Sequence, residues 1–84
     1  MKLSLEQENL LKYVSSVEVR RMIRSRMKTL IKDIEKTYNL RDEIGYTWRM
    51  DSVIAKARKE LYEIERQLAR HSLKQAEKDN KQVI

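Results

Sequence analysis

The sequence predicts an all-α protein, an antiparallel helical hairpin with a short N-terminal helix, completed as a dimeric helical bundle. The first observation is composition: the 84 residues include one Gly and no Pro, the two residue types that most disfavour a helix interior. The second is that apolar residues recur at three- and four-residue spacing, which is typical of amphipathic helices. The third is length, because a chain this short buries only about 60% of the surface of its unfolded form. We therefore expect residues 1–84 to form one helical domain that gains core from a second subunit, with monomeric three-helix packing as the alternative.

The first expected helix covers about residues 4–15. The Ser4 hydroxyl can cap it while Gln7, three residues later, reaches back to the Ser4 backbone in a capping box. Its apolar stripe consists of Leu3, Leu10, Val14 and Val17. This stripe lies about 150° around the helix from the stripe that follows it. We therefore expect a break at Ser15 and Ser16.

The second expected helix covers about residues 17–38. A second capping box, formed by Ser15 and Glu18, would start it, and Asn39 would end it because Asn tolerates the left-handed conformation. Its apolar stripe consists of Val19, Ile23, Met27, Leu30 and Ile34. A connection over residues 39–50, which includes the only Gly, follows this helix.

The third expected helix covers about residues 51–78, with Thr47 or Asp51 as its cap. Its main apolar residues are spaced as in a coiled-coil seam; they are Met50, Ile54, Ala57, Leu61, Ile64 and Leu68. We expect this seam to pack on the second helix in an antiparallel hairpin, and the polar residues 79–84 to fray. A weaker stripe could receive the first helix or a partner subunit; it consists of Ala55, Tyr62, Ala69 and Leu73.

A group of basic residues is the most informative feature of the sequence. The net charge is +6, and a thirteen-residue window without any acid holds Arg20, Arg21, Arg24, Arg26, Lys28 and Lys32. On one helix these side chains would form an electropositive face beside the apolar stripe. Such a face fits phosphate groups or an acidic partner surface. The alternative is a helix face that is merely solvated.

The expected connection gathers aromatic and basic side chains. Arg41, Tyr46, Trp48 and Arg49 all fall within it. Together they could form an interface loop or a platform on which bases stack. The alternative, which we favour from sequence, is a cap that closes the open end of the hairpin, because one Trp is large enough to do so.

The same sequence argues against catalysis. It has no Cys, and its only histidine, His71, has no carboxylate three or four residues away. We therefore expect no metal site, no cofactor, no small-molecule substrate and no enzymatic activity. The longest apolar run is three residues, against the ~20 of a membrane span, and the N-terminus has no signal-peptide core. We expect a cytoplasmic protein without membrane contact.

Two functions remain open. The first is a small regulatory protein that binds nucleic acid, with Arg20, Arg21, Arg24 and Lys28 contacting phosphates and Arg26 and Lys32 peripheral. The second is a protein-binding adaptor or inhibitor, for example a phage or mobile-element accessory protein. It would dock on an acidic surface of a larger host complex, including one that handles nucleic acid. The basic stripe contains no aromatic residue, which favours the second function mildly. A purely structural role in an assembly is a third possibility.

Overall fold

The computed structural model describes the backbone of residues 3–82 and the side chains of residues 3–77. This part of the chain contains three α-helices and no strand: α1 (Leu5–Leu11), α2 (Val17–Ile44) and α3 (Trp48–Gln82). The all-α prediction is therefore confirmed, and so is the number of helices.

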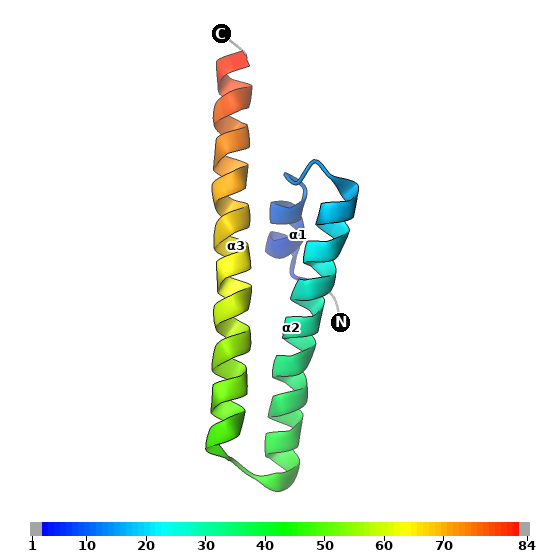
Figure 1. Cartoon of the computed structure of the whole chain (residues 1–84), viewed down its shortest axis with the longest axis vertical. Helices are drawn as coiled ribbons and strands as arrows, with labels where there is room; N and C mark the ends of the chain where they lie inside the picture. The colour runs from blue at the N-terminus through cyan, green and yellow to red at the C-terminus, as the bar shows by residue number, and fades with distance from the viewer. Residues whose placement is uncertain (1–2, 83–84) are drawn as a thin grey trace.

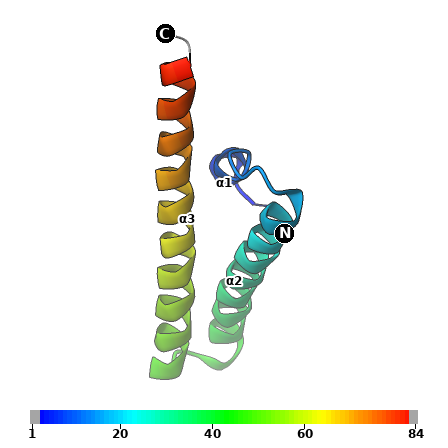
Figure 2. The same ribbon diagram turned by 45° about the horizontal axis from the view of Figure 1, so that its top comes forward.

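The two long helices run antiparallel and are joined by the three residues 45–47 (Figure 1). They lie close together near this connection and separate toward the beginning of α2, where α1 lies between them (Figure 2). The C-terminal part of α3 extends beyond both α1 and the first turn of α2. α1 thus fills the space that opens between the two arms of the hairpin.

The first helix begins as expected and ends early. The Ser4 hydroxyl accepts a hydrogen bond from the Gln7 amide at 3.2 Å, and the Gln7 side chain accepts one from the Ser4 amide at 2.9 Å. The expected extent of 4–15 is wrong, because the helix ends at Leu11. A tight turn, in which the Val14 amide donates to the Leu11 carbonyl at 3.0 Å, then leads the chain toward α2.

The break near Ser15 and Ser16 is confirmed, but the expected capping box is wrong. The cap of α2 is Ser16, whose hydroxyl accepts a hydrogen bond from the Val19 amide at 3.3 Å. Because Val19 then occupies the third helical position, Glu18 is not placed to reach back as a capping-box residue would.

The second helix is longer than expected. Asn39 does not end it; α2 continues to Ile44, and Gly45 ends it with φ of 87°. Glycine adopts this left-handed backbone without steric cost, whereas residues 39–44 are all compatible with helix. The Gly45 amide donates to the Arg41 carbonyl at 2.9 Å, which completes the last turn of α2.

The third helix is extended at both ends relative to the expectation of 51–78. It begins at Trp48, directly after Thr47, so the connection shrinks from 39–50 to 45–47. It continues to Gln82, beyond the expected end at residue 78; residues 83 and 84 of the expected frayed tail lie outside the described part.

The core is built on the seam of α3 and also contains Leu11, which the sequence pattern did not predict. Four seam residues are buried, namely Met50, Ile54, Ala57 and Leu68, and Leu61 and Ile64 are half-buried. Leu11 and Met27 are completely buried. Leu11 was not part of the expected α1 stripe, whereas Val17, which was, is 59% exposed. Because α1 lies between two helices, it buries more than one narrow stripe.

Candidate nucleic-acid interface

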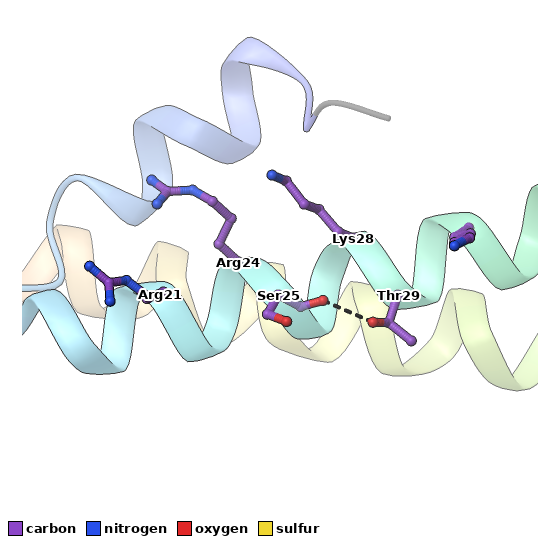
Figure 3. A pocket seen from close by; sticks show the side chains of 6 residues that line it. Arg21, Arg24, Ser25, Lys28 and Thr29 are labelled. Atoms are coloured by element: carbon purple, nitrogen blue, oxygen red, sulfur yellow. Dashed lines mark hydrogen bonds between the residues drawn. The ribbon is translucent and has the colours of Figure 1, made fainter.

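An open groove follows the outer face of α2. It has a volume of about 420 Å³ and is lined by Arg21, Arg24, Ser25, Lys28, Thr29 and Lys32. These residues recur at three- and four-residue spacing, which places them on one face of the helix. Figure 3 shows Arg24 and Lys28 extending from α2 on the side of α1, with Ser25 and Thr29 beside them. We call this feature the basic groove.

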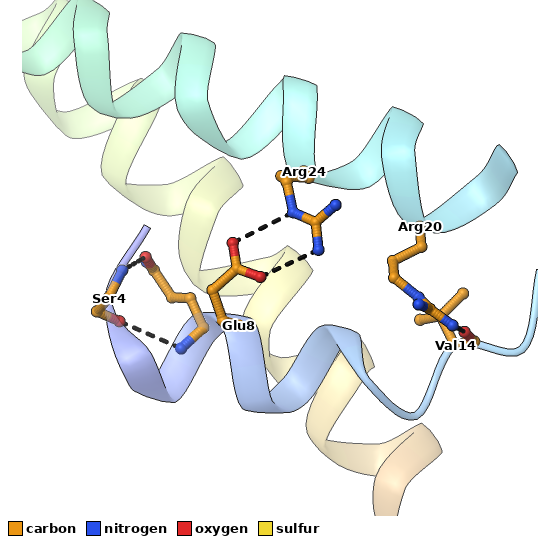
Figure 4. Close-up of polar contacts among 6 residues, drawn as sticks. Ser4, Glu8, Val14, Arg20 and Arg24 are labelled. Carbon is orange, nitrogen blue, oxygen red and sulfur yellow. Dashed lines mark hydrogen bonds and ion pairs between the residues drawn. The ribbon is translucent and has the colours of Figure 1, made fainter. Parts of the chain in front are cut away.

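Arg24 is paired with a carboxylate from another helix. Its Nε and Nη2 atoms donate to the two carboxylate oxygens of Glu8 in α1 at 3.2 and 3.0 Å (Figure 4). Both side chains are about one-third exposed. One of the four cations in the basic groove is therefore neutralised by Glu8 of α1, which lies sixteen residues before Arg24 in the sequence.

Arg20, expected to contact phosphate, is engaged within the chain. Its Nε and Nη2 atoms both donate to the Val14 carbonyl at 3.1 and 2.7 Å (Figure 4). This carbonyl belongs to the segment between α1 and α2, so the guanidinium holds that segment against α2. Arg20 is not among the residues that line the basic groove.

Arg26 also lies outside the basic groove and joins the two long helices. Its Nε and Nη2 atoms donate to the Glu60 carboxylate of α3 at 3.3 and 2.6 Å. The window itself contains no acid, yet Arg24 and Arg26 both have acidic partners. Their partners come from other helices, which a search along α2 alone could not find.

The remaining three basic residues are Arg21, Lys28 and Lys32. All three are exposed, and no carboxylate in the described part of the chain forms an ion pair or hydrogen bond with them. The groove also contains two hydroxyls; that of Thr29 donates to the Ser25 carbonyl at 3.0 Å. The groove therefore presents three unneutralised cations beside hydroxyl groups, an arrangement that suits phosphate oxygens.

The four residues expected in an interface loop lie at the tip of the hairpin, on three different elements. Arg41 is in the last turn of α2, Tyr46 is in the connection, and Trp48 and Arg49 begin α3. The Arg41 guanidinium lies 5.5 Å from the centre of the Tyr46 ring, and that of Arg49 lies 5.6 Å from the Trp48 ring. Trp48 is 72% exposed, so the expectation that it closes the end of the hairpin is wrong.

Tyr46 is further fixed by a hydrogen bond from its hydroxyl to the Asp51 carboxylate. This bond raises the pKa of the Tyr46 phenol above its ordinary value of 10.0, because the carboxylate accepts from the protonated form; slight desolvation and the negative charge of Asp51 act in the same direction. The tip is thus a cluster of aromatic rings and guanidinium groups held by local contacts.

His71 is half-buried and lines an apolar groove beside Leu68 of the seam. Its Nε2 atom is 2.8 Å from the Tyr13 carbonyl, so this nitrogen carries a proton and donates to the segment that follows α1. No group of three His, Cys, Asp or Glu side chains in the described part of the chain could hold a metal ion.

Taken together, these features define a small all-helical protein with a basic groove on one helix and an exposed aromatic tip. None of the helices in the described residues combines the length and apolarity needed to cross a membrane. Comparison of the chain with protein-family models, curated proteins and solved structures finds no match.

Proposed function

We propose that the protein is a small non-enzymatic regulator that binds nucleic acid through the basic groove. The observation that carries this proposal is the presence in one groove of three exposed cations, Arg21, Lys28 and Lys32, without an intramolecular acidic partner. Arg20 and Arg26, in contrast, are engaged in holding the fold together. The phosphate-binding set is thus narrower than the six residues of the basic window.

The dimensions of the groove favour contact with a phosphate backbone. Arg21 and Lys32 are eleven residues apart, which corresponds to about 16 Å along a helix at 1.5 Å per residue. This length matches several successive phosphates of one strand. No aromatic side chain lines the groove, so base stacking does not contribute there. We expect binding that depends on charge and little on sequence.

Fluorescence anisotropy with duplex DNA, single-stranded DNA and RNA over a salt series tests the proposal. Three phosphate contacts predict a slope of about −2.7 for duplex DNA in a plot of log affinity against log salt. The variant Arg21→Ala/Lys28→Ala/Lys32→Ala should lose this binding. A matched control is Lys56→Ala/Lys59→Ala/Arg66→Ala, which removes the same charge from exposed positions of α3. Equal loss in both variants, or no binding at about 50 mM salt, would refute the proposal.

The second function that we put forward is that of a protein-binding adaptor or inhibitor. The exposure of Tyr46 and Trp48, at 58% and 72%, favours it, because exposed aromatic residues beside Arg are enriched in binding hot spots. An accessory protein of a phage or mobile element that docks on an acidic surface of a host complex would fit this description. The triple groove variant would then retain partner binding, whereas Trp48→Ala would lose it.

We further propose that the protein works without a cofactor in the cytoplasm and as a homodimer. The absence of Cys from the sequence fits a reducing compartment. The support for the homodimer comes from the surface of the hairpin that α1 leaves open.

A further inference from the structure

The α2–α3 hairpin has one side that α1 covers and one that it does not. On the covered side, Glu8 of α1 pairs with Arg24, and the Gln7 side chain donates to the Glu65 carboxylate at 2.7 Å. On the other side, α1 contributes nothing, and Arg26 of α2 pairs with Glu60 of α3. We call this second side the open face.

The open face contains an apolar groove near the beginning of α2. Its volume is about 320 Å³, and it is lined by Val14, Val19, Ile23, Ile64, Gln67, Leu68 and His71. Val19 is 45% exposed, and Ile23 and Ile64 are only half-buried. The groove thus leaves part of the hairpin's apolar seam accessible to water.

Helical spacing extends the open face to the tip of the hairpin. Five turns of an α-helix take eighteen residues, so Leu40 lies on the same face of α2 as Met22, and Ile44 on the same face as Arg26. In α3, Val53 precedes Glu60 by seven residues and shares its face. The exposed apolar residues of the open face are Val19 at 45%, Met22 at 71%, Leu40 at 45%, Ile44 at 65% and Val53 at 46%. These residues form two exposed apolar groups, Val19 and Met22 beside the apolar groove and Leu40, Ile44 and Val53 near the tip, and the Arg26–Glu60 pair lies between them.

We propose that two copies of the chain associate through their open faces to form a four-helix bundle, with both hairpin tips at the same end. A two-fold axis parallel to the helices places each α2 opposite α3 of the other copy. Arg26 then lies beside the partner subunit's Glu60, and Leu40 lies beside the partner subunit's Val53, because Leu40 and Val53 are at similar distances from the tip. All neighbouring helices in this bundle are antiparallel, as in up-and-down four-helix bundles.

A second copy is the occupant that the chemistry of the open face favours. One arm contributes a cation and the other a carboxylate, and their side chains meet across the open face, so this charge pair is its own complement under a two-fold rotation. α2 spans 28 residues, about 42 Å at 1.5 Å per residue, and the molecule is 20 Å across. The outline of the two-helix face is therefore comparable with the roughly 800 Å² per partner of a standard interface. By helical spacing, Arg24 and Lys28 of the basic groove lie away from the open face. Arg21, Ser25 and Thr29 line a hollow shared with Met22 and Arg26, so one edge of the basic groove adjoins the proposed interface.

Sedimentation equilibrium without nucleic acid tests the association separately from the proposed binding function. The wild-type chain of 10.2 kDa should sediment at twice that mass. Met22→Glu/Val53→Glu should sediment as a monomer with its helical circular dichroism retained. The matched control Tyr62→Glu/Leu73→Glu changes exposed residues on the outer side of α3 and should remain dimeric. A wild-type chain that stays monomeric, or equal effects of the two double variants, would overturn the proposal.

A charge exchange keeps the test decisive if the first variant fails to fold. Arg26→Glu places two carboxylates together within and between subunits and should dissociate the dimer. Adding Glu60→Arg restores opposite charges and should restore the dimer. A double exchange that remains monomeric while folded would contradict the proposed interface.

Crosslinking tests the orientation of the two copies. The described chain has no Cys, so single cysteines can be introduced. A mixture of Leu40→Cys and Val53→Cys chains should form a mixed product with a short bismaleimide. A mixture of Val19→Cys and Val53→Cys chains should not, because Val19 lies on the open face at the end far from the tip. The opposite result would overturn the arrangement with both tips at one end.

Discussion

Glu8 of α1 holds Arg24 of α2 through two hydrogen bonds of 3.2 and 3.0 Å. The same guanidinium lines the basic groove. This ion pair therefore connects the docking of the short N-terminal helix with the charge of the basic groove. An anion that enters the groove would compete with Glu8 for Arg24, so binding and α1 docking are linked through this residue.

Glu8→Gln should strengthen nucleic-acid binding while weakening the fold slightly. The substitution leaves Arg24 free to contact an additional phosphate, which would make the salt slope steeper by about 0.9. The loss in unfolding free energy should stay below about 1 kcal/mol, because the pair is about one-third exposed and screened by solvent. Anisotropy and urea denaturation measure the two effects. Glu60→Gln, which frees Arg26 outside the groove, serves as control, and equal strengthening by both would argue against the groove.

Arg20→Ala should lower stability and leave nucleic-acid binding nearly unchanged. The variant removes both hydrogen bonds to the Val14 carbonyl, and a hydrogen bond from a charged donor contributes about 1.5–3 kcal/mol when it is well shielded. Because this site is only partly buried, we expect a loss of about 1 kcal/mol in urea denaturation. A large loss of affinity for nucleic acid without a loss of unfolding free energy would instead indicate that Arg20 contacts phosphate.

Periodicity in the sequence was sufficient to predict the helical seam and the break before α2. The apolar spacing of α3 was long and regular, and the phase change at Ser15 and Ser16 required an interruption. Helix ends were predicted less well, because Asn39 and Gly45 both allow a helix to stop. The helix continues to Gly45 because the residues between the two positions favour helix. It ends there because glycine accepts a positive φ most easily.

The partners of the basic residues could not be predicted for a different reason. Glu8 lies sixteen residues before Arg24, and Glu60 lies thirty-four residues after Arg26. Local charge patterning reports only on neighbours three or four residues apart. The packing of α1 and α3 on α2 is therefore needed to distinguish the basic residues that form ion pairs within the fold from those that are free to bind a ligand.

Leu11→Ala should be among the most destabilising substitutions in the chain. Leu11 is 0% exposed, and replacing a buried Leu by Ala costs about 2–5 kcal/mol. Leu5→Ala, in the same helix at 77% exposure, should cost little. Urea denaturation followed by circular dichroism gives both values. Similar costs at the two positions would mean that α1 does not dock on the hairpin in solution.

Gly45→Ala should destabilise the hairpin by about 1 kcal/mol through backbone strain alone. The glycine has φ of 87°, and a Cβ atom at this position would meet no atom within 4 Å. The cost therefore comes from the left-handed backbone that L-residues disfavour. Asn39→Ala, in the interior of α2, should be neutral or stabilising because Ala favours helix. Thermal denaturation compares the two, and a neutral Gly45→Ala would contradict the observed helix end.

The Tyr46 phenol should ionise above its ordinary pKa of 10.0. Its hydrogen bond to the Asp51 carboxylate requires the protonated phenol and raises its pKa above 10.0. The bond therefore supports the folded tip below that pH, and this support is lost as the pH rises through the raised pKa. Ultraviolet difference titration should show a late-ionising component that disappears in Tyr46→Phe. Asp51→Asn should return this component toward the ordinary range, because a neutral amide neither repels the phenolate nor requires the phenol proton. A titration curve unchanged by Asp51→Asn would show that the bond does not form in solution.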